Sequence, residues 1–161
     1  MRALWTGVAI LAALLLQSAL GRLLPGESRV VDLFLLVLVY CALTGGETFG
    51  MLAGGVAGWV QDIHFGGTVL GLSGLTKVLV GFAVGLAGSR FLLSGTGART
   101  LVLLLTTVAD GLIFEWLAAV FDVKTLSLST GGLLTRAGVN AVLGVAVYTV
   151  LDRRLPREER A

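Results

Sequence analysis

The sequence predicts an all-α integral membrane protein, a single bundle of six transmembrane helices. Of its 161 residues, 56% are hydrophobic and 14% are charged, whereas roughly a quarter of the residues in a soluble globular domain are charged. The mean hydropathy is +0.94. At ~20 residues per span, the chain has room for five or six crossings. We therefore expect one transmembrane domain, residues 1–151, followed by a basic tail, residues 152–161.

The first apolar run, residues 3–20, is expected to be a retained transmembrane helix. A secretory signal peptide is the alternative, because Met1-Arg2 precedes the run and a poor cleavage site ends it. The run is longer than the usual ~7–15-residue apolar core of a signal peptide, and further spans follow it. These two differences favour a membrane span.

Residues 30–60 are too many for one crossing. A single helix would be ~46 Å long, against a hydrocarbon core of ~30 Å, and it would place Glu47 near the middle of the bilayer, where a charge is costly. A break at Gly45-Gly46-Glu47 predicts a tight hairpin of two short spans, 30–44 and 47–61. The remaining apolar runs predict three more spans, at about 68–89, 100–121 and 132–151.

The distribution of arginines predicts the orientation, because positive charges favour the cytoplasmic side. Arginines gather in the tail and in the loop at 90–99, so both are placed in the cytoplasm. Six spans then put the N-terminus in the cytoplasm as well, but they send Arg22 and Arg29 outside. Five spans would satisfy the charge rule better. We expect six, because Glu47 in mid-bilayer is the costlier violation.

Among the polar residues within the predicted spans, five are the candidates for buried contacts, namely Lys77, Asp110, Glu115, Arg136 and Asn140. Counting along the helices at ~1.5 Å per residue places Lys77 near the level of Asp110 and Arg136 near the level of Glu115. Charges at this depth usually face the bundle interior and pair. We expect one or two buried ion pairs that act as a polar clasp between helices. A proton or solute path is the alternative, but the balance of acids and bases favours mutual neutralisation.

Glycines recur at intervals of four through the middle of the chain and predict close helix packing. The candidates are Gly46, Gly50, Gly54, Gly58, Gly67, Gly71, Gly81 and Gly85. They form two strips on successive helices. We expect one strip to close the bundle and the other to receive a partner helix.

The loop between these two helices contains Gln61, Asp62 and His64. Asp62 is expected to cap or brace the loop. His64 is the single histidine and Cys41 the single cysteine, so neither indicates a metal site or an internal disulfide. No nucleophilic triad or phosphate-binding loop occurs at the required spacing, and no basic stripe indicates nucleic-acid binding. The sequence thus predicts no enzyme, metal or cofactor.

The central region resembles the rod shape-determining protein MreD family. The resemblance rests on GWVQDI at 58–63, FGG at 65–67, LGLSGL at 70–75 and KVLVGFAVG at 77–85, and it extends over about 50–88. Like that family, the chain has a glycine-spaced helix ending in Gln-Asp, a glycine-containing loop and a second glycine-spaced helix. The size and a span count near six also agree.

The resemblance implies a non-enzymatic, multi-pass protein of the bacterial inner membrane that belongs to the cell-elongation machinery. Members act with the single-span protein MreC, and through it with the RodA/penicillin-binding protein 2 peptidoglycan synthase and MreB filaments. The family bundle is similar to the S components of energy-coupling-factor transporters. A small-solute binding or transport subunit is therefore the alternative function, with Lys77, Asp110, Glu115 or Arg136 at its site.

Overall fold

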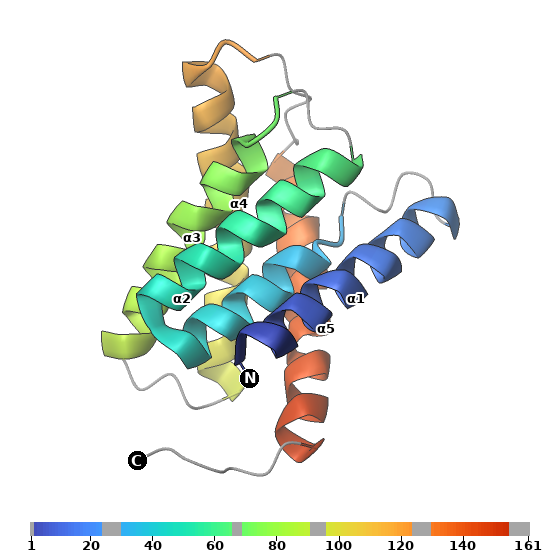
Figure 1. Ribbon diagram of the computed structural model, residues 1–161, viewed down its shortest axis with the longest axis vertical. Coiled ribbons are helices and arrows are strands. Elements are labelled where there is room, and N and C mark those ends of the chain that lie inside the picture. Colours follow the sequence, from blue (N-terminus) through green and yellow to red (C-terminus); the bar gives the residue numbers. More distant parts are fainter. Residues whose placement is uncertain (1, 24–29, 66–68, 91–95, 124–129, 155–161) are drawn as a thin grey trace.

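The computed structural model describes residues 2–23, 30–65, 69–90, 96–123 and 130–154. These residues form an all-helical bundle (Figure 1) whose helices are α1 (Arg2–Leu23), α2 (Leu33–Phe65), α3 (Leu72–Arg90), α4 (Thr96–Val120) and α5 (Thr130–Arg154). Within the described residues, 5 helices are long and apolar enough to cross a membrane. The predicted count of six is therefore not confirmed.

The difference in count arises at α2, which folds back on itself at Gly46 (Figure 1). The rings of Phe34 and Phe65, near its two ends, have centroids 6.2 Å apart, whereas a straight helix would separate these residues by ~46 Å. α2 is thus a hairpin of two arms, 33–45 and 47–65. The first arm is only ~20 Å long, shorter than the ~30 Å hydrocarbon core. That each arm crosses the membrane stays a prediction.

The turn in α2 depends on the backbone of Gly46. This residue has φ 80° and ψ −174°, a conformation that is essentially restricted to glycine. A Cβ atom at this position would meet nothing within 4 Å. Backbone conformation, rather than crowding, therefore requires glycine at the turn, within the break that the sequence indicated.

The second arm of α2 packs backbone to backbone against α3. A Cβ atom at Gly50 would collide with the carbonyl oxygen of Gly81, and one at Gly54 with the carbonyl oxygen of Lys77. The predicted glycines that have a backbone neighbour of this kind are Gly50, Gly54, Gly58, Gly81 and Gly85. The two strips therefore face each other. The expectation that one of them receives a partner helix is wrong, because both are covered inside the bundle.

The predicted glycine Gly71 does not belong to this interface. Gly71, with φ 99°, lies in the turn before α3, where it is the residue that allows the positive φ. Gly67 and the tail beyond residue 154 lie outside the described residues.

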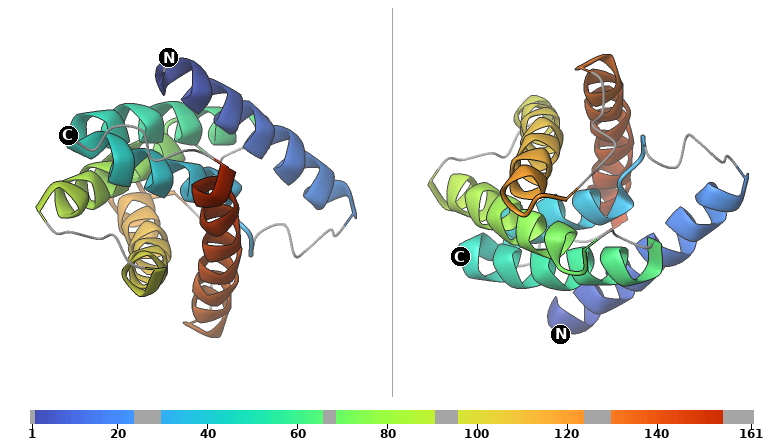
Figure 2. Two further views of the ribbon diagram at one scale, coloured as in Figure 1. Left: turned by 90° about the horizontal axis from the view of Figure 1, so that it is seen from below. Right: turned by 90° about the horizontal axis from the view of Figure 1, so that it is seen from above.

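The α2 hairpin forms the centre of the bundle. α1 packs against α2, α3 against both α2 and α4, and α4 against α5. Figure 2 shows α1 and α4 on opposite sides of α2. Leu38 and Val39 of the first arm, Val80 of α3 and Leu103 of α4 are almost completely buried in the shared core. This packing brings the polar ends of several helices to one place.

Candidate functional site

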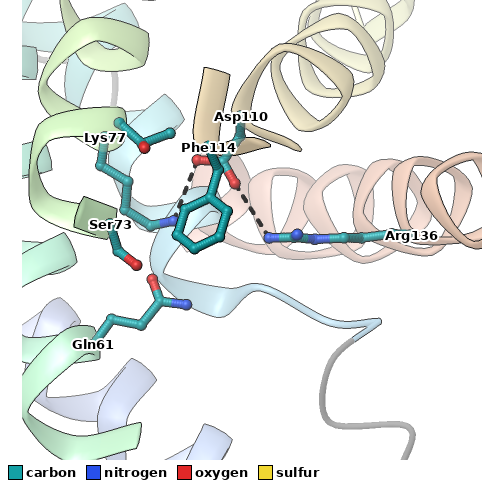
Figure 3. A pocket seen from close by; sticks show the side chains of 7 residues that line it. Gln61, Ser73, Lys77, Asp110, Phe114 and Arg136 are labelled. Carbon is teal, nitrogen blue, oxygen red and sulfur yellow. Dashed lines mark hydrogen bonds and ion pairs between the residues drawn. The ribbon is translucent and has the colours of Figure 1, made fainter. Parts of the chain in front are cut away.

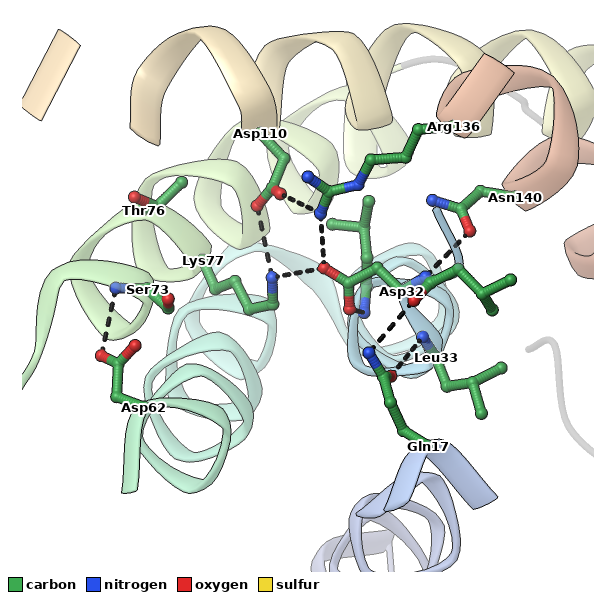
Figure 4. A network of polar contacts seen from close by, with 12 residues as sticks. Gln17, Asp32, Leu33, Asp62, Ser73, Thr76, Lys77, Asp110, Arg136 and Asn140 are labelled. Atoms are coloured by element: carbon green, nitrogen blue, oxygen red, sulfur yellow. Dashed lines mark hydrogen bonds and ion pairs between the residues drawn. The ribbon is translucent and has the colours of Figure 1, made fainter. Parts of the chain in front are cut away.

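Four charged side chains from four segments meet inside the bundle (Figure 4). Lys77 Nζ of α3 lies 3.0 Å from Asp32 Oδ2 and 3.4 Å from Asp110 Oδ1 of α4. Arg136 Nη2 of α5 lies 2.9 Å from Asp32 Oδ2 and 3.2 Å from Asp110 Oδ2. Each cation thus contacts both carboxylates. We call Asp32, Lys77, Asp110 and Arg136 the ion-pair cluster.

The cluster is buried and electrically balanced. The Lys77 and Asp32 side chains are each 2% exposed, that of Asp110 is 5% exposed and that of Arg136 is 14% exposed. An unpaired charge at such a position would cost several kcal/mol of desolvation free energy. Two carboxylates and two cations have a formal sum of zero. The cluster therefore satisfies its own charges without a counter-ion.

Asp32 is the residue that connects the cluster to the start of α2. Its Oδ1 accepts a hydrogen bond of 2.9 Å from the backbone N–H of Leu35, as an N-cap carboxylate does. Its own N–H donates to Asn140 Oδ1 at 3.0 Å. The Asp32 side chain thus caps α2 and pairs with Lys77 and Arg136. Asn140 fixes the backbone of Asp32 to α5.

Gln17 of α1 holds the backbone on both sides of Asp32 (Figure 4). Its Nε2 donates to the carbonyl oxygen of Val31 at 3.0 Å, and its Oε1 accepts from the N–H of Leu33 at 3.0 Å. Val31 and Leu33 lie at the start of α2, where backbone groups have no intrahelical partner. α1 therefore supports the position of Asp32 without contributing a charge.

Asp62, near the end of α2, caps the neighbouring helix α3. Its Oδ2 accepts hydrogen bonds from the backbone N–H groups of Gly71 at 2.8 Å, Ser73 at 3.1 Å and Gly74 at 3.4 Å. A carboxylate at a helix N-terminus satisfies otherwise unpaired donors and interacts favourably with the helix dipole. The structure thus places Asp62 where it fixes the α2–α3 connection.

The structure brings together Lys77, Asp110 and Arg136, with Asn140 beside them, but it does not bring Glu115 to Arg136. Glu115 is half-buried on α4 and forms no ion pair with any residue that the structure describes. Five residues beyond Asp110, it points ~140° away around the helix axis. The expected pairing of Glu115 with Arg136 is wrong, and Asp32 takes that place.

Sequence reasoning missed Asp32 and Gln17. Asp32 lies at the edge of a predicted span, where a solvated helix cap is the ordinary role of an aspartate. Its position immediately before the apolar run LFLLVLV is an N-cap signal that was available. Gln17 is a single amide in an apolar run, and it is 5% exposed in the structure. A polar residue within a predicted span was the signal that could have identified Gln17.

A cavity of about 150 Å³ adjoins the ion-pair cluster (Figure 3). It lies toward the end of the bundle where α2 ends and α3 and α5 begin. Its walls come from α2, α3, α4 and α5 and consist of Gln61, Ser73, Thr76, Lys77, Asp110, Phe114 and Arg136. Among the described residues, no group of three His, Cys, Asp or Glu side chains could hold a metal ion.

One of the comparisons with known proteins identifies a family for this chain. The family model of the rod shape-determining protein MreD matches residues 2–148, which include α1 to α4, most of α5 and the whole ion-pair cluster. No curated protein and no solved structure matches the chain. The match extends over nearly the whole chain, well beyond the central motifs at 50–88. The chain therefore belongs to the MreD family of rod shape-determining membrane proteins.

Proposed function

We propose that this multi-pass protein is a non-enzymatic scaffold of the rod-shape machinery, situated in the bacterial inner membrane with both termini in the cytoplasm. It binds the transmembrane helix of an MreC-like single-span protein. Through that protein it acts on the RodA/penicillin-binding protein 2 synthase and on MreB-like filaments, and so helps to control peptidoglycan synthesis and cell shape. The observation that carries this proposal is the family match over residues 2–148.

The ion-pair cluster supports a scaffold rather than a transport path. A transported proton or solute needs a polar group that can exchange partners, whereas each charge here contacts two charges of opposite sign. The contacts join the start of α2 to α3, α4 and α5. The cluster thus acts as a clasp that fixes how these helices meet.

The surface for the partner helix must lie outside the glycine strips, which are covered by each other. Large apolar side chains point outward on α1, α4 and α5, and examples are Leu11, Leu105 and Val142, which are 55%, 61% and 72% exposed. In a membrane such faces contact either lipid or another helix. A single-span partner would pack on one of them.

The alternative, an S-component-like solute-binding subunit, has one observation in its favour, the cavity beside the cluster. At about 150 Å³ it is smaller than the ~300–1,000 Å³ that is usual for ligand pockets. Phe114 is the aromatic residue in its wall, and the charged residues of that wall are already neutralised within the ion-pair cluster, which includes Asp32 behind them. The scaffold is therefore the better-supported function.

Affinity purification of the full chain from detergent extract, followed by mass spectrometry, tests the proposal. A scaffold is expected to bring down an MreC-like single-span protein in near-stoichiometric amount. Recovery of an ATPase-linked transporter in its place would support the solute-binding alternative and overturn the proposal.

A further inference from the structure

The cavity beside the ion-pair cluster has a buried acceptor and a buried donor without partners among the described residues. The acceptor is Gln61 Oε1 and the donor is Arg136 Nε, and both residues form part of the cavity wall. In Figure 3, the Gln61 side chain extends toward Ser73 and Lys77. Buried polar groups are nearly always hydrogen-bonded, because leaving one unpaired costs folding free energy. Two on one cavity wall point to a group that enters the cavity.

The charges around the cavity indicate that this group is uncharged. Lys77 and Arg136 are each held by both Asp32 and Asp110, so the cluster sums to zero before anything binds. An added anion or cation would bring an uncompensated charge into a buried site. Hydroxyl groups suit these two residues, because a hydroxyl can donate to Gln61 Oε1 or accept from Arg136 Nε without adding charge.

The volume and the position of the cavity further narrow the chemical class of the group that enters it. A volume of about 150 Å³ is about five times the ~30 Å³ that a water molecule occupies in the liquid, which gives room for a group the size of glycerol. Phe114 provides an apolar wall for its carbon atoms. Gln61, Ser73 and Arg136 lie within about two turns of the ends of their helices, which is the level at which lipid headgroups meet a bundle.

We propose that this cavity is a binding site for an uncharged polyol, the diol or sugar headgroup of a membrane lipid, held by Gln61 and Ser73 and oriented by Arg136. The site goes beyond the scaffold function and does not depend on it. The headgroup enters at the end of the bundle where α3 and α5 begin, while its acyl chain stays in the surrounding lipid. A free polyol offers the same hydroxyl groups, so the test includes both sources.

The test measures the midpoint of thermal unfolding, Tm, of the full chain in an amine-oxide detergent, which has no hydroxyl group of its own. The probes are 1-oleoylglycerol as the lipid, glycerol as the free polyol and inorganic phosphate as a charged control. A ligand that binds the folded state at 100 times its Kd raises Tm by about 5–10 °C in a chain of this size. We expect that rise with 1-oleoylglycerol and none with phosphate.

Two variants locate the site and one serves as a matched control. Gln61→Leu removes the acceptor at similar volume, and Ser73→Ala removes a hydroxyl from the cavity wall. Both are expected to lose most of the rise caused by 1-oleoylglycerol. Ser89→Ala removes an exposed hydroxyl at the other end of α3 and is expected to retain it. If Gln61→Leu fails to fold, the Tm rise of Ser73→Ala compared with that of Ser89→Ala tests the site instead.

Glycerol distinguishes the two possible sources of the ligand, a lipid headgroup and a free polyol. It stabilises many proteins by exclusion from their surface, so only a rise that Ser73→Ala removes counts as binding, and that result would support the site with a free polyol as its ligand. The proposal is overturned if neither polyol gives a rise that depends on Gln61 or Ser73, or if phosphate raises Tm more than 1-oleoylglycerol does. None of these readouts involves a partner protein, so they are independent of the affinity purification.

Discussion

Asp32 combines three structural roles in one carboxylate. It contacts Lys77 and Arg136, and it caps α2 through the N–H of Leu35. Its partners Lys77 and Arg136 are 45 and 104 residues away in the chain. Hydropathy and spacing report how deep a residue lies along its own helix, but they do not report which distant helix end lies beside it. The pairing of Lys77 with Asp110 could therefore be predicted from their similar depth. The ion pairs that Asp32 forms could not.

Replacing Asp32 with asparagine is expected to destabilise the protein strongly. Asp32→Asn keeps the shape but leaves two buried cations against one carboxylate, and breaking a buried pair on one side typically costs about 3–5 kcal/mol. Glu115→Gln is the control, because Glu115 has no ion pair among the described residues, and a change within about 0.5 kcal/mol is expected there. Unfolding of both variants in mixed micelles measures the difference. Equal stability of the two would contradict the role given to Asp32.

The network of contacts predicts how double changes at the cluster behave. Lys77→Met alone leaves a net negative charge, whereas Lys77→Met with Asp110→Asn leaves the neutral pair of Asp32 and Arg136. The double variant is therefore expected to be more stable than Lys77→Met, with a coupling free energy of about 0.5–3 kcal/mol in a double-mutant cycle. Additive effects of the two changes would show that Lys77 and Asp110 do not interact. The cycle is measured by the same unfolding assay.

At the scale of elements, the glycine strips are the contact between α2 and α3. The four-residue spacing correctly indicated close packing, but spacing alone does not identify what covers a strip. Here the fold-back at Gly46 lays the second arm of α2 against α3, so each strip covers the other. The apolar runs indicated where the helices lie, and Gly45-Gly46-Glu47 indicated the break in α2. A short first span was expected at 30–44, and the helix of the first arm begins three residues later, at Leu33.

Adjacent glycines in α2 provide a matched test of this interface. Gly54 faces the backbone of Lys77, whereas a Cβ atom at Gly55 would meet a methyl group of Val78 at 3.3 Å. Gly54→Ala is expected to lower stability by about 1–3 kcal/mol, because the backbones must separate. Gly55→Ala is expected to be close to neutral, or stabilising by up to ~1 kcal/mol through helix propensity. Measured unfolding free energies with the opposite order would refute the backbone contact.

At the scale of the whole molecule, the hairpin of α2 is central and the other helices are arranged around it. α3, α4 and α5 are joined to its start by the ion-pair cluster. α1 is joined to α2 through Gln17, through the contact of Thr6 Oγ1 with Cys41 Sγ at 3.6 Å, and through the contact of Ser18 Oγ with His64 Nε2 at 2.9 Å. The outward faces of α1, α4 and α5 stay apolar. The ion-pair cluster is thus internal, and the outward faces of these three helices suit lipid or other helices.

The proposed scaffold function requires this MreD-family bundle to bind a single transmembrane helix. The most direct measurement is the Kd between the purified full chain in nanodiscs and an MreC-like protein with and without its transmembrane segment. We expect saturable binding that is lost when that segment is deleted. No binding, or binding of equal strength without the segment, would contradict it.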